Sequence, residues 1–129
     1  MQDFRQLKVW EKAHHFVLAV YRETSSFPVD ERFGLTSQIR RASTSIPTNI
    51  AEGCGRSSNP DFARFLGMSM GSASEVEYQI VLARDLGFFS HECEEALESD
   101  LMEIKRMLNA LMQRVQNNSQ GKSGLRTKD

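Results

Sequence analysis

The sequence predicts an all-α fold, an antiparallel up-down-up-down bundle of four helices. Four segments place apolar residues at three- and four-residue steps, which is the spacing of one buried helical face. Short stretches with Gly, Pro or Ser separate these segments, and no segment alternates apolar and polar residues as a half-buried strand would. Long amphipathic helices joined by short loops pack as antiparallel neighbours. The 129 residues suit one domain of this kind.

The first helix is expected within residues 4–24, where Pro28 follows its end and the Asp30-Glu31 pair suits the start of the next helix. Its apolar face consists of Leu7, Trp10, Ala13, Phe16, Val17 and Val20. The second helix continues the spacing from Leu35 to Gly53, and Gly53 and Gly55 offer left-handed positions that close it.

Pro47 lies in the middle of the second helix and is expected to bend it, because proline removes a backbone donor and crowds the carbonyl four residues earlier. At about 100° per residue, a polar stripe on this helix separates from the opposite flank. One flank holds Gln38, Arg41, Ser45, Asn49 and Glu52, and the opposite one holds Arg40, Thr44, Pro47 and Ala51. The adjacent Arg40 and Arg41 are therefore expected to point toward different neighbours.

The third helix is expected to begin at Asn59 as the N-cap, with Pro60 in the first helical position, and to end before Gly87. Gly67 and Gly71 lie in its interior, which costs about 0.5–1 kcal/mol each relative to Ala and indicates the close approach of another helix, from this chain or another subunit. Ser90 is expected to cap a fourth helix with an apolar seam of Leu97, Leu101, Ile104, Leu108, Leu111 and Val115. Residues 1–116 form the expected domain, and 117–129 an expected disordered polar tail.

Composition limits the possible functions. The net charge is −1, so any contact with nucleic acid must be local rather than global. The residues expected to make it are Arg40, Arg41, Arg56 and Arg64, whereas residues 92–103 are strongly acidic. The first residues lack the apolar region of a signal peptide, no run is long enough for a membrane span, and two cysteines suit a reducing compartment. We therefore expect a cytoplasmic protein that does not associate with a membrane.

No complete catalytic or metal-binding pattern appears in the sequence. A di-iron bundle needs two Glu-x-x-His pairs, and only Glu11 and His14 have that spacing. Cys54 follows a helix, and the negative end of a helix opposes thiolate formation. We therefore expect no metal, no cofactor and no enzymatic activity.

Three stretches, "FRQLKVWEKA", "FGLTSQIRRASTSIPTNIAEGCGR" and "FARFLGMSMGSASEVEYQIVLARDLGF", resemble the bacterial four-helix bundle proteins known as 23S ribosomal RNA intervening-sequence proteins. The resemblance covers roughly residues 2–115. Relatives of that family include the accessory variability protein of diversity-generating retroelements, a pentameric barrel that works with a reverse transcriptase and nucleic acid. The resemblance thus implies a homo-oligomer, most simply a pentameric ring.

Two hypotheses of function remain open. In the leading one, the chain is a non-enzymatic oligomeric module that associates with RNA or a ribonucleoprotein. In the rival one, it is a protein-protein scaffold without a role in nucleic-acid binding. The residues expected to shape the helices or the contacts between subunits are Pro47, Asn49, Glu52, Gly67 and Gly71.

Overall fold

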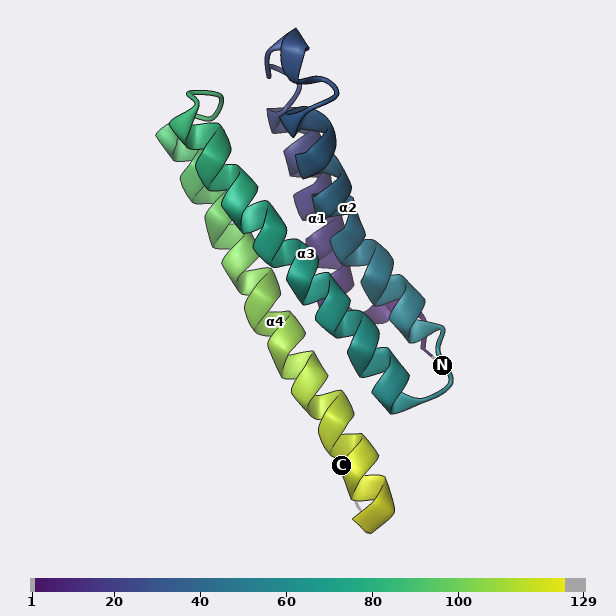
Figure 1. Ribbon diagram of the computed structural model, residues 1–129. Coiled ribbons are helices and arrows are strands. Elements are labelled where there is room, and N and C mark those ends of the chain that lie inside the picture. Colours follow the sequence, from purple (N-terminus) through teal and green to yellow (C-terminus); the bar gives the residue numbers. More distant parts are fainter. Residues whose placement is uncertain (1, 125–129) are drawn as a thin grey trace.

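The computed structural model describes residues 2–124 and shows four long helices side by side (Figure 1). They are α1 (Lys8–Glu23), α2 (Leu35–Cys54), α3 (Asn59–Asp85) and α4 (His91–Gly124). Two short 3-10 turns, η1 (Phe4–Gln6) and η2 (Val29–Glu31), precede α1 and α2. The described part of the chain contains no strand. The predicted all-α four-helix fold is confirmed.

The core runs along the axis of the bundle and consists of the apolar faces predicted from the spacing. The largest side chains in it are less than 2% exposed: Phe16, Val20, Ile39, Ile46, Ile50, Leu66, Val76, Ile80, Leu101, Ile104 and Leu108. Each such side chain contributes roughly 1.5–3 kcal/mol when it leaves water. At one end of the bundle, the start of α4 meets the end of α1, through Cys93 and Glu23, and the end of α3, through Glu94 and Arg84.

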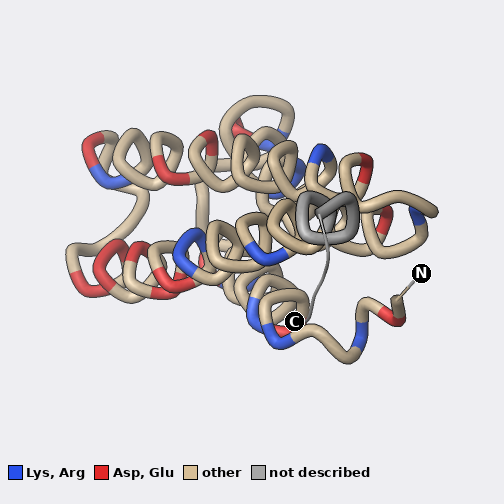
Figure 2. The backbone as a smooth tube through the Cα atoms, turned by 90° about the horizontal axis from the view of Figure 1, so that it is seen from below, with Lys and Arg blue, Asp and Glu red and all other residues tan. Residues whose placement is uncertain are grey.

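Charge changes sign along α4. Its first half carries Glu92, Glu94, Glu95, Glu98, Asp100 and Glu103, whereas the basic residues Lys105, Arg106 and Arg114 follow later. Figure 2 shows this separation along the helix. The later half of α4 lies at the same end of the bundle as the α2–α3 turn and the start of α1 (Figure 1).

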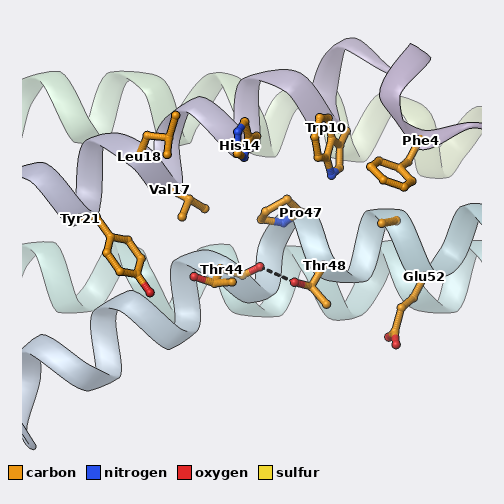
Figure 3. A pocket seen from close by; sticks show the side chains of 11 residues that line it. Phe4, Trp10, His14, Val17, Leu18, Tyr21, Thr44, Pro47, Thr48 and Glu52 are labelled. Carbon is orange, nitrogen blue, oxygen red and sulfur yellow. Dashed lines mark hydrogen bonds between the residues drawn. The ribbon is translucent and has the colours of Figure 1, made fainter.

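Pro47 is buried inside α2, and the helix continues through it. Figure 3 shows its ring facing α1. The hydroxyls around it donate to backbone carbonyls: Thr44 to the carbonyl of Arg40 at 2.7 Å, and Thr48 to the carbonyl of Thr44 at 2.8 Å. Such bonds are common for Thr in a helix and often accompany a bend.

Gly53 has a different role from the predicted one. It belongs to α2, and an added Cβ would lie 2.8 Å from Cδ1 of Phe62 and 3.0 Å from Cβ of Phe65. It therefore permits close packing of α3 rather than a left-handed helix end. Gly55 has a φ of −84° and is not left-handed either. Among the described residues, Gly87 after α3 has the positive φ, +84°, that favours glycine.

The start of α3 differs from the prediction by one residue, whereas the start of α4 matches it. Ser58, not Asn59, is the N-cap of α3, because its side chain accepts a hydrogen bond from the amide of Asp61 at 3.2 Å. Ser90 accepts from the amide of Cys93 at 3.1 Å, as expected of a cap.

The helix α4 continues to Gly124, so residues 117–124 are helical where the sequence predicts a disordered tail. The apolar seam ends at Val115, but loss of burial does not stop a helix, since propagation adds a backbone hydrogen bond per residue. Residues 125–129 of the predicted tail lie outside the described residues, and the boundary of the domain at residue 116 stays a prediction.

We expect Gly53→Ala to lower the free energy of unfolding by about 1–3 kcal/mol, because the new methyl group overpacks the contact with Phe62 and Phe65. Urea denaturation followed by circular dichroism measures the change. Gly67→Ala is the matched control: an added Cβ there meets no atom within 4 Å, so helix propensity favours Ala by up to about 1 kcal/mol. Equal effects of the two substitutions would contradict the packing role of Gly53.

Candidate nucleic-acid interface

The four arginines predicted to contact nucleic acid lie in two separate places. Arg40 and Arg41 are in the first half of α2, whereas Arg56 and Arg64 flank the α2–α3 turn. Sixteen residues separate Arg40 from Arg56, which is about 24 Å along a helix at 1.5 Å per residue. The structure therefore does not bring the four side chains into one cluster.

Arg40 is half-buried and holds the end of α1. Its Nε donates to Oγ1 of Thr24 at 2.8 Å, and its Nη2 donates to the backbone carbonyl of Tyr21 at 3.2 Å. Its Cζ also lies 4.5 Å from the centroid of the Tyr21 ring. A cation at the last turn of a helix compensates the carbonyls that have no partner there. Arg40 thus links α2 to the end of α1.

Arg41 is exposed and lies on the other flank of α2. Ser45, one turn further along this flank, accepts from Oγ of Ser72 in α3 at 2.8 Å. Asn49 is buried there and donates to the hydroxyl and the carbonyl of Ser45, both at 2.9 Å. The two flanks of α2 therefore face α1 and α3, as the helical spacing predicts. Both hydrogen bonds of Asn49 stay within α2, and one of them is to the Ser45 hydroxyl that accepts from Ser72.

Arg56 and Arg64 come together over one aromatic ring. Their Cζ atoms lie 4.5 and 4.7 Å from the centroid of the Phe65 ring. Asp61 lies between them: its Oδ1 is 2.9 Å from Nη2 of Arg64, and its Oδ2 is 3.9 Å from Nε of Arg56. The ring and the carboxylate fix the positions of both guanidinium groups at the start of α3.

A polar cleft of about 230 Å³ opens beside Arg56, between the start of α3 and the later part of α4. The polar side chains that line it are Gln2, Arg56, Ser57, Ser58, Asn59, Arg114 and Asn118, above a floor that includes Cys54, Phe62 and Leu111. Arg114 also lines a neighbouring hollow of about 360 Å³ together with Lys8 and Arg106. We call the group of Lys8, Arg56, Arg64, Arg106 and Arg114 the basic end of the bundle.

Three of these residues were not predicted from the sequence. Lys8, Arg106 and Arg114 are far from the arginines of residues 32–64 in the chain, and the fold brings them together. The change from acidic to basic residues along the fourth helix, combined with an antiparallel topology, was the signal available for finding Arg106 and Arg114.

The residues of the basic end differ in how far they are neutralised. Arg106 forms an ion pair with Glu103, and the hydrogen bond from Arg106 holds the pKa of Glu103 below its usual range. Arg56 and Arg64 share Asp61. Among the described side chains, neither Lys8 nor Arg114 has a carboxylate within 4.0 Å. Lys8 and Arg114 therefore have the cationic groups most available to an anion.

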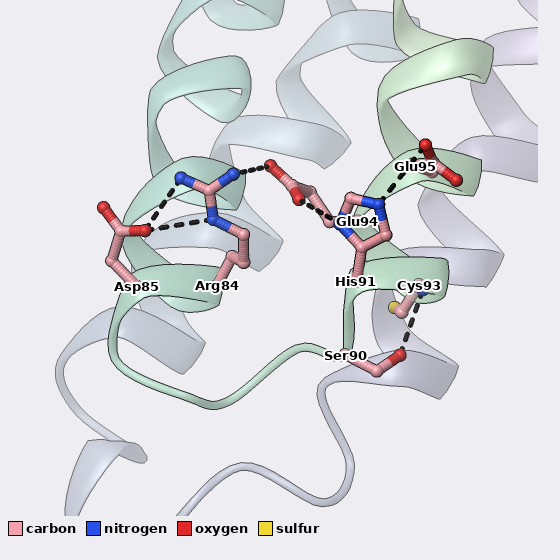
Figure 4. A network of polar contacts seen from close by, with 7 residues as sticks. All are labelled: Arg84, Asp85, Ser90, His91, Cys93, Glu94 and Glu95. Carbon is pink, nitrogen blue, oxygen red and sulfur yellow. Dashed lines mark hydrogen bonds and ion pairs between the residues drawn. The ribbon is translucent and has the colours of Figure 1, made fainter.

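The opposite end of the bundle carries a compact network (Figure 4). Glu94 is buried, and its Oε2 accepts from Nη1 of Arg84 at 3.0 Å. His91 lies over Glu94 and Glu95, with its Nε2 3.4 Å from Oε2 of Glu95. Burial, followed by the charge of Glu94, raises the pKa of Glu98. The acidic start of α4 is thus partly a buried ion-pair site and not only a solvated face.

The remaining predicted residues have separate surroundings. Glu52 is exposed and lines a groove between α1 and α2 (Figure 3). Gly67 and Gly71 lie on the outward side of α3, where an added Cβ at either position would meet no atom within 4 Å. The close helix approach that the glycines predict does not occur within the described part of this chain.

The two cysteines carry neutral thiols at ordinary pH. Burial, followed by the carboxylate of Asp3, raises the pKa of the Cys54 thiol. Burial, followed by the carboxylate of Glu23, raises the pKa of Cys93 to about 11, and the Cys93 Sγ lies 3.5 Å from Oε1 of Glu23. A thiol of high pKa is a poor nucleophile near neutral pH. Neither thiol is therefore activated as a nucleophile for covalent catalysis.

Neither a metal cluster nor a membrane span occurs in the part of the chain that the structure describes. No three His, Cys, Asp or Glu side chains among these residues gather closely enough to hold a metal ion. None of the helices described is both long and apolar enough to traverse a lipid bilayer.

A family model described as 23S rRNA-intervening sequence protein matches residues 5–110. The chain belongs to this family. Among solved structures, a protein of unknown function from the S23 ribosomal protein family of Bacteroides thetaiotaomicron VPI-5482 is similar, with a TM-score of 0.75 and 26% identity. That match covers 81% of this chain and 95% of the other one. No curated protein matches the chain.

We expect Arg40→Ala to destabilise this family member by about 1–3 kcal/mol, because it removes two hydrogen bonds that join α2 to the end of α1. The neighbouring exposed Arg41→Ala should change the free energy of unfolding by less than about 0.5 kcal/mol. Urea denaturation of both variants measures the difference. An effect at Arg41 as large as that at Arg40 would show that Arg40 has no special structural role.

We expect Cys93 to react slowly with a thiol reagent near pH 8 and faster as the pH rises toward 11, because the thiolate forms only near its raised pKa. Stopped-flow labelling of the Cys54→Ser variant isolates this thiol. Replacement of Glu23 by Gln should shift the pH profile downward. A profile centred near that of free cysteine would contradict the assigned surroundings.

Proposed function

We propose that this chain is a non-enzymatic module that binds RNA through the basic end of its bundle and works as a homo-oligomer. The observation that carries the proposal is the cleft in which Arg56 and Arg114 meet, although 58 positions separate them in the sequence. No carboxylate belongs to the described lining of this cleft. An anion is therefore the ligand that its chemistry favours.

A phosphate group suits the cleft better than a carboxylate-bearing peptide or a neutral ligand. Two guanidinium groups offer forked donors, and Asn and Ser side chains add neutral ones. The start of α3 contributes the positive end of a helix dipole. Contacts of this type position a nucleic acid by its backbone and do not read its sequence.

The family description supports RNA as the nucleic acid to test first, since it refers to 23S rRNA. Raised thiol pKa values at Cys54 and Cys93 support a role without nucleophilic catalysis. Contact with RNA would also suit a cytoplasmic protein. We extend the proposal to a ring of five copies, in which five basic ends act together and raise the overall affinity of a weak single contact.

The outward side of α3 supports an assembly as well. Gly67 and Gly71 have no side chains, so the surface of α3 is recessed at these positions. On the same helix, Met68 is 46% exposed and Tyr78 is 63% exposed. A helix of another copy would find small residues for close approach and apolar side chains around them. We therefore keep Gly67 and Gly71 as candidate interface residues.

The test is the binding of labelled structured RNA across a salt series, with the mass of the oligomer measured in the same buffer. We expect the affinity to fall with salt. Arg114→Gln should lower the steepness of log K against log salt by about 0.7–0.9 for each phosphate that a copy no longer neutralises. Arg56→Gln should act in the same direction but less, because Asp61 partly neutralises Arg56.

The matched control is Arg22→Gln, since Arg22 is also exposed but lies at the opposite end of the bundle. It should leave the RNA affinity within about twofold of the parent. Absence of salt-dependent binding by an intact oligomer would overturn the proposal. Equal weakening at Arg22 and Arg114 would overturn the assignment to the basic end.

A protein-protein scaffold without nucleic acid is the second candidate. The observation that favours it is that Asp61 already pairs with Arg56 and Arg64, while several large apolar side chains are exposed. This alternative predicts an oligomer that retains no RNA even at low salt.

A further inference from the structure

A groove runs between α1 and α2, and its lining is mostly apolar, with His14, Thr44, Thr48 and Glu52 as its polar members (Figure 3). Its volume is about 590 Å³, and its lining includes Phe4, Trp10, Leu18, Tyr21, Pro47 and Ala51. Leu18 and Tyr21 are 49% and 45% exposed, so an apolar surface of the bundle stays in contact with water. This is the size of a site that encloses a sizeable apolar group.

A second unusual apolar feature lies in the connection between α1 and α2. Phe33 is 89% exposed and Val29, four residues earlier, is 76% exposed. These are the two most exposed of the large apolar side chains described. Because Phe33 and Val29 project at the end of the bundle, we call them the apolar knob. Neither groove nor knob is covered by another part of the described chain.

The knob cannot fill the groove of its own molecule. Pro47, in the middle of the groove, lies twelve residues after the start of α2 at Leu35. At 1.5 Å per residue this is about 18 Å along a rigid helix. A knob that enters the middle of a groove must therefore belong to a different molecule.

Charges next to the two surfaces favour a second copy of this chain as that molecule. Arg32 is adjacent to the knob, with its Cζ 5.7 Å from the centroid of the Phe33 ring. The same turn carries Asp30 and Glu31, and Glu31 accepts a hydrogen bond from the amide of Leu35 at 3.0 Å. Glu52 lies on α2 at the edge of the groove, with its carboxylate turned away from Phe4 (Figure 3). Among the described side chains, neither Arg32 nor Glu52 has an opposite charge within 4.0 Å. Opposite charges of this kind fix the orientation of a docked partner.

We propose that Phe33 and Val29 of one copy insert into the α1–α2 groove of the next copy, with Arg32 of the first beside Glu52 of the second. The knob and the groove are different surfaces, so the contact is heterologous. Copies related in this way close into a ring if the rotation allows it and otherwise form a filament. The inference rests on the proposed oligomer and specifies one interface of it.

Sedimentation of purified variants tests the contact. We expect Phe33→Ser and, separately, Leu18→Gln to raise the concentration for half-assembly at least tenfold, about 1.4 kcal/mol. Both side chains are exposed in the single chain, so the helical content should be unchanged. Met102→Ser is the matched control, because Met102 is 60% exposed on α4, outside the knob and the groove. It should assemble like the parent.

Mixing the two defective variants gives the decisive readout. Phe33→Ser keeps an intact groove and Leu18→Gln an intact knob, so the mixture should form one-to-one dimers at a concentration where each variant alone is monomeric. In a separate pair, Arg32→Glu and Glu52→Arg should each weaken assembly, and their combination in one chain should restore it. This rescue does not depend on removing an apolar side chain.

The outcomes separate this inference from the proposed function. Parental assembly of Phe33→Ser, or a mixture that stays monomeric, would overturn the knob-in-groove contact while leaving the oligomer and its RNA binding standing. A parent protein that is monomeric at high concentration would overturn both the contact and the oligomer.

Discussion

The seam between α2 and α3 is the contact on which the candidate site depends. Gly53 lets Phe62 and Phe65 pack against the backbone of α2, and the buried hydroxyl of Ser69 donates to the carbonyl of Ile46 at 2.9 Å. The turn between the helices spans only residues 55–58. Because the seam fixes both helices up to this turn, it also holds the guanidinium group of Arg56 over the Phe65 ring.

Much of the fold could be predicted because burial repeats with the helical period. Leu97, Leu101, Ile104, Leu108, Leu111 and Val115 are all buried, as their spacing indicates. The same reasoning misplaced the end of α4, because apolar spacing reports where a helix touches the core and not where its hydrogen bonds end. It also misread Gly53, since a glycine near a helix end serves a turn or a close contact, and only the position of Phe62 distinguishes them.

The candidate site was less predictable than the fold because it combines residues from three distant segments. The sequence indicated Arg56 and Arg64 but grouped them with Arg40, whose donors hold the end of α1. Arg114 looks like an ordinary surface residue until α4 is placed beside the start of α3. A local sequence motif cannot predict that Arg56 and Arg114 line the same cleft, because the packing angles of the helices decide which side chains lie close together.

The reversal of charge along α4 separates an acidic part of this helix from a basic part, even though the net charge of the chain is only −1. A nearby polyanion would attract the basic part of such a molecule and repel the acidic part, which gives a torque even where the net pull is small. Within roughly the 8 Å over which physiological salt screens charge, that torque would turn the basic end toward the polyanion and the start of α4 away from it. The arrangement of charge thus governs the angle of approach more than its strength.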